Sequence, residues 1–90
     1  FYVFLENEGL SGVKHGTFDL SPEINANIAS GVTMFGIDQQ PFLQGYGGIQ
    51  ALNLLVRYGV VPALPVTPTG PGFVTQDNLS VVETLAGEYR

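Results

Sequence analysis

Few side chains in this sequence could perform acid–base or nucleophilic chemistry, and their spacing does not form a catalytic set. The single histidine, His15, falls in a predicted strand that places Asp19 about 13 Å further along the chain, beyond hydrogen-bond reach. None of the four serines lies in a nucleophile-elbow pattern, and Ser21 is better explained as a helix cap. A structural role is therefore the favoured interpretation of His15, and we expect no enzymatic activity.

Glycine-rich and acidic segments allow two further interpretations, and a simpler role explains each. The run Thr69–Phe73 lacks the lysine and the glycine spacing of a phosphate-binding loop, so it indicates a turn. Glu6 with Glu8, or Asp19 with Glu23, could be acid–base pairs, but helix capping and a hydrated surface account for these carboxylates. One histidine and scattered carboxylates give no metal-ligand spacing, and we expect neither a metal nor another cofactor.

The composition predicts a folded chain that belongs to a larger protein. Of the 90 residues, 44% are hydrophobic and only 12% are charged, which favours burial and argues against disorder. A chain of this length holds one domain at most. So few charged groups would solubilise a complete protein poorly, and we expect some apolar faces to pack against polypeptide outside this sequence.

The charge balance and the absence of cysteine exclude several classes of partner and site. Eight acidic and three basic residues give a net charge of −5, and Lys14, Arg57 and Arg90 lie far apart in the sequence. Because no basic patch can neutralise phosphates, nucleic acid is not an expected partner. A chain without cysteine has no disulfides or thiolate metal sites, which fits the cytoplasm and the periplasm equally. No apolar run reaches the roughly 18 residues of a membrane-spanning helix.

Local patterns predict alternating helices and strands in the first half of the chain. Residues 1–10 indicate a helix that ends at a glycine, and residues 13–18 indicate a short strand. Residues 21–31 then predict a second helix, because a capping serine precedes a proline at its start and a glycine stops it. Residues 32–37 are apolar and rich in β-forming types, as in a strand buried on both faces of a parallel sheet.

The second half predicts one long helix, an extended connector and a final helix. The long helix should run from Gln40-Pro41 to Gly59, followed by a proline-rich connector over residues 60–74 and an amphipathic helix over residues 77–87. The long helix has an apolar stripe that we expect to be buried, and it consists of Phe42, Tyr46, Ile49, Leu52 and Val56. The order of elements predicts an α/β fold, a three-layer sandwich with a parallel sheet and right-handed crossovers.

Three runs of the sequence together resemble the end of the type I periplasmic sugar-binding proteins. The runs occur in the family's order, and they are Gly16–Glu23 (GTFDLSPE), Phe35–Tyr46 (FGIDQQPFLQGY) and Pro68–Thr75 (PTGPGFVT). Each run alone would be weak, and the specificity of the resemblance comes from their order. The opening Phe1–Glu8 departs from the alanine-rich helix of the family at that position.

The resemblance implies two α/β lobes, joined by three crossing segments, that close on a sugar held between them. It assigns residues 13–38 to the C-terminal lobe and residues 39–65 to a helix of the N-terminal lobe. Residues 66–90 are then a hinge crossing and the terminal helix. The chain would be the C-terminal portion of such a protein, and the remainder of the same polypeptide would complete both lobes.

The resemblance also implies the ligand-binding positions. Gln39 matches the position at which the family commonly places an amide that hydrogen-bonds ligand hydroxyls from the hinge. An amide both donates and accepts, and the carboxyl edge of a parallel strand is where open α/β sheets bind ligands. Asp19 and Asp38 also end strands that face the cleft. The alternative for Gln39 is a hinge or capping role, and capping of the following helix is the preferred interpretation of the two aspartates.

The function implied is capture of a sugar or polyol and its delivery to the membrane permease of an ABC transporter. Such a protein would be periplasmic, or lipid-anchored outside the cell in a Gram-positive bacterium. The runner-up is the ligand-sensing domain of a sugar-responsive LacI-type transcription repressor, which shares the two-lobed fold. A small α/β enzyme is a third interpretation, and it lacks catalytic residues.

Overall fold

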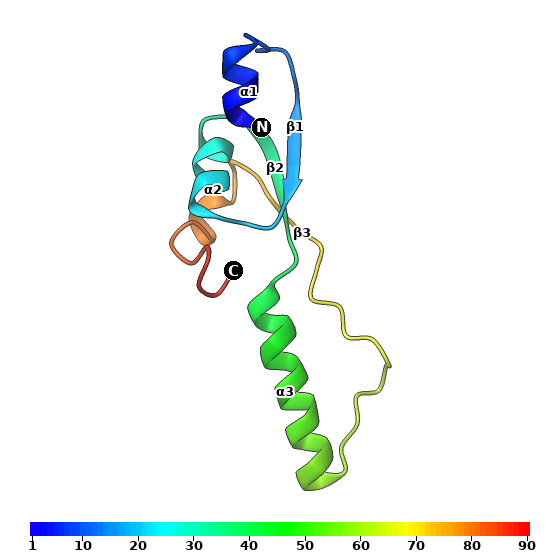
Figure 1. Ribbon diagram of the computed structural model, residues 1–90. Helices are drawn as coiled ribbons and strands as arrows, with labels where there is room; N and C mark the ends of the chain where they lie inside the picture. The colour runs from blue at the N-terminus through cyan, green and yellow to red at the C-terminus, as the bar shows by residue number, and fades with distance from the viewer.

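The structure, a computed structural model that describes residues 1–90, is an elongated molecule (Figure 1). It measures 59 × 23 × 22 Å and has a radius of gyration of 17.3 Å, whereas a compact chain of this length would have about 12 Å. The elements in chain order are α1 (Tyr2–Asn7), β1 (His15–Phe18), α2 (Pro22–Ala29), β2 (Thr33–Asp38), α3 (Pro41–Tyr58), β3 (Gly72–Val74) and the 3-10 helix η1 (Leu79–Val81).

Two parts account for this shape, and Figure 1 shows them one above the other. The sheet module (residues 1–38 and 72–90) contains the three strands with α1, α2 and η1. The arm (residues 41–71) consists of α3 and the extended chain that returns from it to β3. The predicted helices over residues 1–10, 21–31 and 40–59, the strands over residues 13–18 and 32–37 and the extended connector are confirmed, with ends shifted by a few residues.

The sheet has the strand order β1-β2-β3 and is mixed rather than parallel throughout. β1 and β2 run parallel, as predicted for strands joined by a crossover helix. β3 pairs antiparallel with β2, through Gly36 opposite Val74 and Asp38 opposite Gly72. The prediction of a wholly parallel sheet is therefore wrong, because the chain leaves β2 along α3 and re-enters beside it in the opposite direction.

Only one face of the sheet is covered within this chain. The core on that face contains Ile28, Val74, Leu79 and Val82, with Leu20 and Ile24 packed against it. On the other face Phe35 and Phe73 contact each other edge to face, and the side chain of Phe73 remains 55% exposed. The chain therefore supplies two layers of the predicted three-layer sandwich, consistent with an α/β fragment of a larger fold.

α2 begins as its sequence predicts. The Oγ atom of Ser21 accepts a hydrogen bond from the backbone N–H of Ile24 at 3.1 Å, and Pro22 takes the first helical position. The helix ends at Ser30, and Gly31 follows with a positive φ of 81°. Ile28, which is fully buried, anchors α2 on the sheet. These local signals determine where α2 begins and ends in the sequence, and therefore where β1 must end before it and β2 begin after it.

α3 has the predicted length, but its apolar stripe is not buried in this chain. It ends at Gly59, whose φ of 65° is the left-handed C-cap conformation. No residue of α3 is buried, and Ile49 and Val56 are 69% and 82% exposed. The expectation of a buried stripe is wrong within these 90 residues, because no other element packs on the helix. α3 is also not long and apolar enough to cross a membrane, nor is any other helix.

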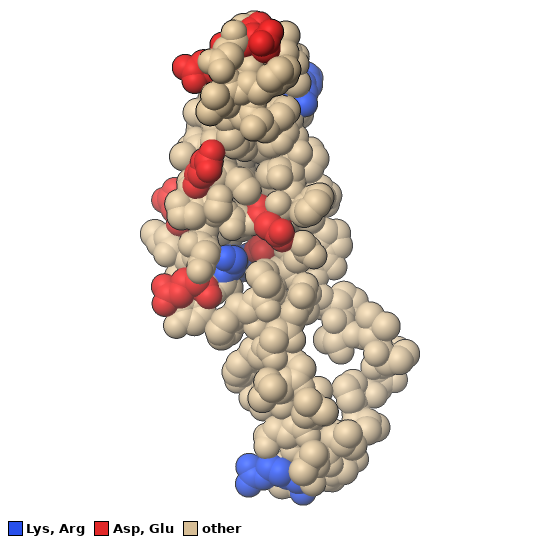
Figure 2. All heavy atoms as spheres, viewed as in Figure 1, with Lys and Arg blue, Asp and Glu red and all other residues tan.

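The arm is almost free of charge. Residues 39–76 contain a single charged side chain, Arg57, although most of their surface is exposed. Figure 2 shows the acidic groups gathered on the sheet module and a basic group at the far end of α3. An exposed, apolar helix with a single charged residue fits the expectation that polypeptide outside this sequence covers it.

The predicted helix over residues 77–87 is wrong. After β3 the chain forms only the short η1 and a series of turns. Asn78, near the predicted start of that helix, bonds backward: its Oδ1 accepts from the N–H of Thr75 at 2.8 Å, and its Nδ2 donates to the carbonyl of Phe73 at 2.9 Å. These bonds form a turn that directs Leu79 and Val82 into the core.

Candidate functional site

Two polar residues that end neighbouring parallel strands meet at one edge of the sheet. Asp19 follows β1 and Gln39 follows β2, and the Nε2 atom of Gln39 donates to Oδ1 of Asp19 at 2.7 Å. The backbone N–H of Asp19 also bonds the carbonyl of Ile37 at 2.8 Å, which extends the strand pairing to this point. Both residues are candidate ligand-binding positions from the sequence, and the structure brings them together because parallel strands end on the same side.

The preferred interpretation of Asp19 as a helix cap is wrong. Ser21, not Asp19, caps α2, and the carboxylate of Asp19 instead accepts from Gln39. Asp19 also has a positive φ of 65°, a conformation that aspartate tolerates better than most residues. Its side chain is thereby free to lie at the carboxyl edge of the sheet.

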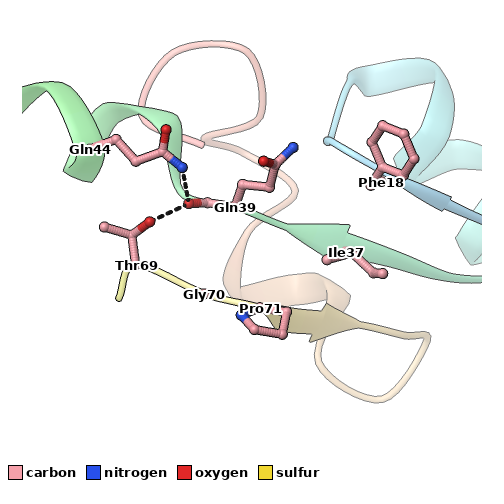
Figure 3. A pocket seen from close by; sticks show the side chains of 7 residues that line it. All are labelled: Phe18, Ile37, Gln39, Gln44, Thr69, Gly70 and Pro71. Atoms are coloured by element: carbon pink, nitrogen blue, oxygen red, sulfur yellow. Dashed lines mark hydrogen bonds between the residues drawn. The ribbon is translucent and has the colours of Figure 1, made fainter. Parts of the chain in front are cut away.

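A hollow of about 480 Å³ lies beside Gln39, between the sheet module and the arm (Figure 3). Its lining consists of Phe18, Ile37, Gln39, Gln44, Thr69, Gly70 and Pro71. Figure 3 shows the side chain of Gln39 extending toward the side of the hollow on which Phe18 lies. The ring of Phe18 is 66% exposed, so an apolar surface stands next to the amide and carboxylate pair.

The backbone of Gln39 is fixed by hydrogen bonds from both directions of the chain (Figure 3). Its carbonyl oxygen accepts from Nε2 of Gln44 at 3.0 Å and from the hydroxyl of Thr69 at 2.9 Å. The side-chain amide of Gln40 donates to the carbonyl of Thr69 at 2.6 Å. The chain that leaves the sheet module is thus tied to the chain that returns to it. Gln40, Gln44 and Thr69 were not predicted as site residues, and the only signal for them in the sequence is the run of amide residues around Pro41.

Asp38 does not line the hollow. It is 2% exposed, and both of its oxygens are engaged within the protein. Oδ1 accepts from the backbone N–H of Gln40 at 2.8 Å, and Oδ2 pairs with Nη1 of Arg90 at 2.6 Å. Gln40 is the N-cap residue of α3, so Asp38 holds the start of that helix, close to the capping role that the sequence favoured.

His15 lies apart from this site. Its Nδ1 is 3.0 Å from Oγ1 of Thr33, which also bonds the hydroxyl of Tyr2 at 2.9 Å. Phe1 stacks on the imidazole with ring centroids 4.4 Å apart. These contacts give His15 the structural role that was expected, at the opposite end of β1 from Asp19.

The site can therefore do hydrogen-bonding chemistry with a neutral, hydroxyl-rich molecule. Asp19 supplies an acceptor, and Gln39 supplies both a donor and an acceptor. No group of three or more His, Cys, Asp or Glu side chains is placed to hold a metal ion. The seven residues that line the hollow are uncharged, and the carboxylate of Asp19, bonded to Gln39, is the charged group next to them.

Comparisons with known proteins agree with this chemistry. No family model matches the sequence. The chain is 39% identical over 75 residues to the xylose/arabinose-binding protein XylF of Sulfolobus acidocaldarius, an alignment that covers 82% of this chain and 18% of that protein. It also matches the crystal structure of a carbohydrate transporter from Acidothermus cellulolyticus 11B in complex with myo-inositol. This match has a TM-score of 0.81 and 32% identity, and it covers 91% of this chain and 29% of that one.

The chain thus spans less than a third of either relative. It is a partial homologue of a sugar-binding protein and has the fold of part of a carbohydrate transporter protein. Both relatives are binding or transport proteins and not enzymes, and their greater length is consistent with the expectation that this chain is a portion of a larger protein. The resemblance found in the sequence is confirmed at this level.

Proposed function

We propose that this chain is the C-terminal portion of a type I periplasmic sugar-binding protein. It would capture a sugar or polyol between two lobes and deliver it to the permease of an ABC transporter. The observation that carries the proposal is the Asp19–Gln39 pair, 2.7 Å apart at the carboxyl edge of two parallel strands. This pair lies in a chain similar to a xylose/arabinose-binding protein and to an inositol-bound transporter protein.

In this proposal the lobes divide as the resemblance implies. Residues 13–38 belong to the C-terminal lobe, residues 39–65 to a helix of the N-terminal lobe, and residues 66–90 cross back and return to the C-terminal lobe. The separation of α3 from the sheet and its bare apolar surface support this division, because a helix of another lobe would have its partners there. The bonds between Gln39 and Thr69 then join two hinge segments.

The ligand class is a pentose or a cyclic polyol. Asp19 and Gln39 suit neighbouring hydroxyl groups, and the exposed ring of Phe18 suits the apolar face of a sugar ring. Asp38 supports the site from behind through Gln40 rather than by contact with the ligand. The protein would act outside the cytoplasmic membrane, in the periplasm or anchored by a lipid. A repressor's sensor domain is not favoured, since both relatives are named for binding or transport.

Substitution of Gln39 in the intact protein tests the proposal. Gln39→Ala should weaken binding by roughly 1 to 3 kcal/mol, or about 5- to 150-fold in Kd, because ligand hydroxyls lose a partner in a cleft shielded from water. The measurement is calorimetric titration with D-xylose, L-arabinose, myo-inositol and a panel of other sugars and polyols. Thermal unfolding should change much less, since the side chain of Gln39 is exposed without ligand.

Gln50→Ala is the matched control. It also removes an exposed amide from this chain, but it lies on α3 and bonds only Tyr46. Its affinity for every sugar should equal that of the wild type. An intact protein that binds none of the panel contradicts the proposed function. A Gln39→Ala variant that binds its sugar normally and melts markedly lower contradicts only the site assignment.

A further inference from the structure

The last residues of the chain form a compact loop fixed to the sheet module. Leu79 and Val82 are buried in the core, 6% and 3% exposed. Beyond them, the carbonyl of Leu85 accepts hydrogen bonds from three backbone N–H groups, those of Glu88, Tyr89 and Arg90, at 3.1 to 3.2 Å. The N–H of Gly87 also donates to the carbonyl of Arg90 at 2.7 Å. This terminal loop (residues 83–90) is therefore closed on itself rather than a loose tail.

The terminal loop contacts the chain on both sides of the outward hinge segment, Gln39-Gln40. On the sheet side, Nη1 of Arg90 lies 2.6 Å from Oδ2 of Asp38, the last residue of β2. On the arm side, the ring of Tyr89 packs edge to face on Phe42, with centroids 4.9 Å apart and an interplanar angle of 69°. Two adjacent residues thus bridge the segment from which Gln39 extends.

Of the two contacts, the ion pair with Asp38 matters more, because it compensates a buried charge. The carboxylate of Asp38 is 3% exposed, and a buried charge needs an opposite charge and hydrogen bonds. Arg90 is the only cation near it, since Lys14 precedes β1 and Arg57 lies at the far end of α3. This is also the only ion pair in the chain. Loss of this ion pair would let the side chain of Asp38 move, which would weaken its hydrogen bond to the backbone N–H of Gln40 at the start of α3.

We propose that Tyr89 and Arg90 are positioning residues that hold the hinge in its sugar-binding geometry. This inference rests on the proposed function, because it assigns α3 to a lobe that moves against the sheet module. The match to an inositol-bound structure extends over both the sheet module and α3, so the hinge angle here resembles that of a ligand-bound relative. The two contacts stabilise that angle, and removing them shifts the protein toward a more open form.

The experiment measures hinge opening directly in the intact protein. Spin labels are attached to cysteines introduced at Glu23 on α2 and Asn53 on α3, both exposed in this chain, which has no cysteine of its own. Any cysteine elsewhere in the protein is first replaced. Distance distributions are then recorded by pulsed electron resonance without sugar and with saturating D-xylose or myo-inositol. The variants are Tyr89→Ala, Arg90→Gln and the charge-conserving Arg90→Lys.

Tyr89→Ala and Arg90→Gln should broaden the distribution without sugar and move it away from the wild-type distances. They should also weaken sugar binding by about 2- to 30-fold, the range for changes that act through a coupled element. Arg90→Lys should restore most of the affinity. Glu88→Gln is the matched control, because it changes a charge in the same loop and touches neither contact, and it should behave as the wild type.

Wild-type distributions and affinity in both Tyr89→Ala and Arg90→Gln would overturn the inference. So would weaker binding with unchanged distances, which would mean that the loop acts in some way other than through the hinge. Tyr89→Ala keeps the test valid if Arg90→Gln does not fold. The distances without sugar separate this inference from the proposed function: a broadened distribution in a protein that binds no sugar supports the hinge role and refutes only sugar binding.

Discussion

The hydroxyl of Thr69 donates to the carbonyl oxygen of Gln39 at 2.9 Å, although 30 residues separate the two in sequence. This bond joins the chain that leaves the sheet module to the chain that returns to it. Thr69→Val keeps the shape of the side chain and removes the donor, so the intact protein should lose about 0.5 to 1.5 kcal/mol of stability in urea unfolding. Thr67→Val, an exposed neighbour without such a bond, is the control and should be neutral. Equal unfolding midpoints for the two variants would show that the bond contributes nothing.

Gly70 allows the returning chain to approach the end of β2. A Cβ atom at this position would lie 2.8 Å from the backbone carbonyl oxygen of Asp38. Because this carbonyl lies at the end of β2, it cannot easily move away. Gly70→Ala should therefore destabilise the intact protein by about 1 to 3 kcal/mol, as overpacked positions do. At Gly72 the nearest atom would be 3.7 Å away, so Gly72→Ala provides a control in ordinary contact. Chemical denaturation of both variants checks the difference, and a Gly70→Ala protein as stable as the control contradicts it.

The sequence predicted those features that depend on neighbouring residues. Ser21-Pro22 determined the start of α2, and Gly59 the end of α3, because caps act within one turn of a helix. The parallel pairing of β1 and β2 followed from α2 between them, and it brought the predicted residues Asp19 and Gln39 together. Here the local pattern was sufficient.

Features that depend on distant residues could not be predicted. Arg90 pairs with Asp38 across 52 positions, and no pattern near either residue indicates the other. Asn78 has the form of a helix cap, yet it bonds backward to Thr75 and Phe73, and the predicted final helix is replaced by turns. The direction of β3 depends on the path of the arm, which the proline-rich sequence leaves undetermined. The stripe of α3 was correctly identified as apolar, but this chain holds nothing to cover it.

The buried ion pair makes a prediction about additivity. Asp38→Asn removes the charge that Arg90 pairs with, while its side-chain oxygen can still accept from the N–H of Gln40. We expect a loss of about 1 to 3 kcal/mol in the unfolding free energy of the intact protein. The double variant Asp38→Asn with Arg90→Gln should be no less stable than Asp38→Asn alone, because the two substitutions remove the same ion pair. Asp77→Asn, at an exposed carboxylate, is the neutral control, and fully additive losses would refute the pairing.

Substitution of Gly45 tests whether other polypeptide covers α3 in the intact protein. Gly45 lies on the apolar stripe, three residues after Phe42 and four before Ile49, and a Cβ atom at this position would meet nothing of this chain within 4 Å. In the isolated chain, Gly45→Ala should raise helix content by circular dichroism, since alanine favours a helix by about 1 kcal/mol over glycine. In the intact protein the same change should destabilise by about 1 to 3 kcal/mol, because we expect the polypeptide that covers α3 to pack closely against this glycine. Stabilisation in both contexts would mean that nothing covers this face of α3.

The isolated 90 residues should not form a stable monomer. Only 9 of 90 residues are buried, and the apolar core contains four of them. One sheet face, with Phe18 and Phe73 exposed, and most of the apolar surface of α3 would remain in water, which burial of so small a core cannot offset. Light scattering should therefore show association, or exchange of the arm between copies, and urea should produce no cooperative transition. The intact protein, measured alongside, should be monodisperse and unfold cooperatively. An isolated chain that is monomeric, with an unfolding free energy above about 5 kcal/mol, would show that the sheet module and the arm need no further polypeptide.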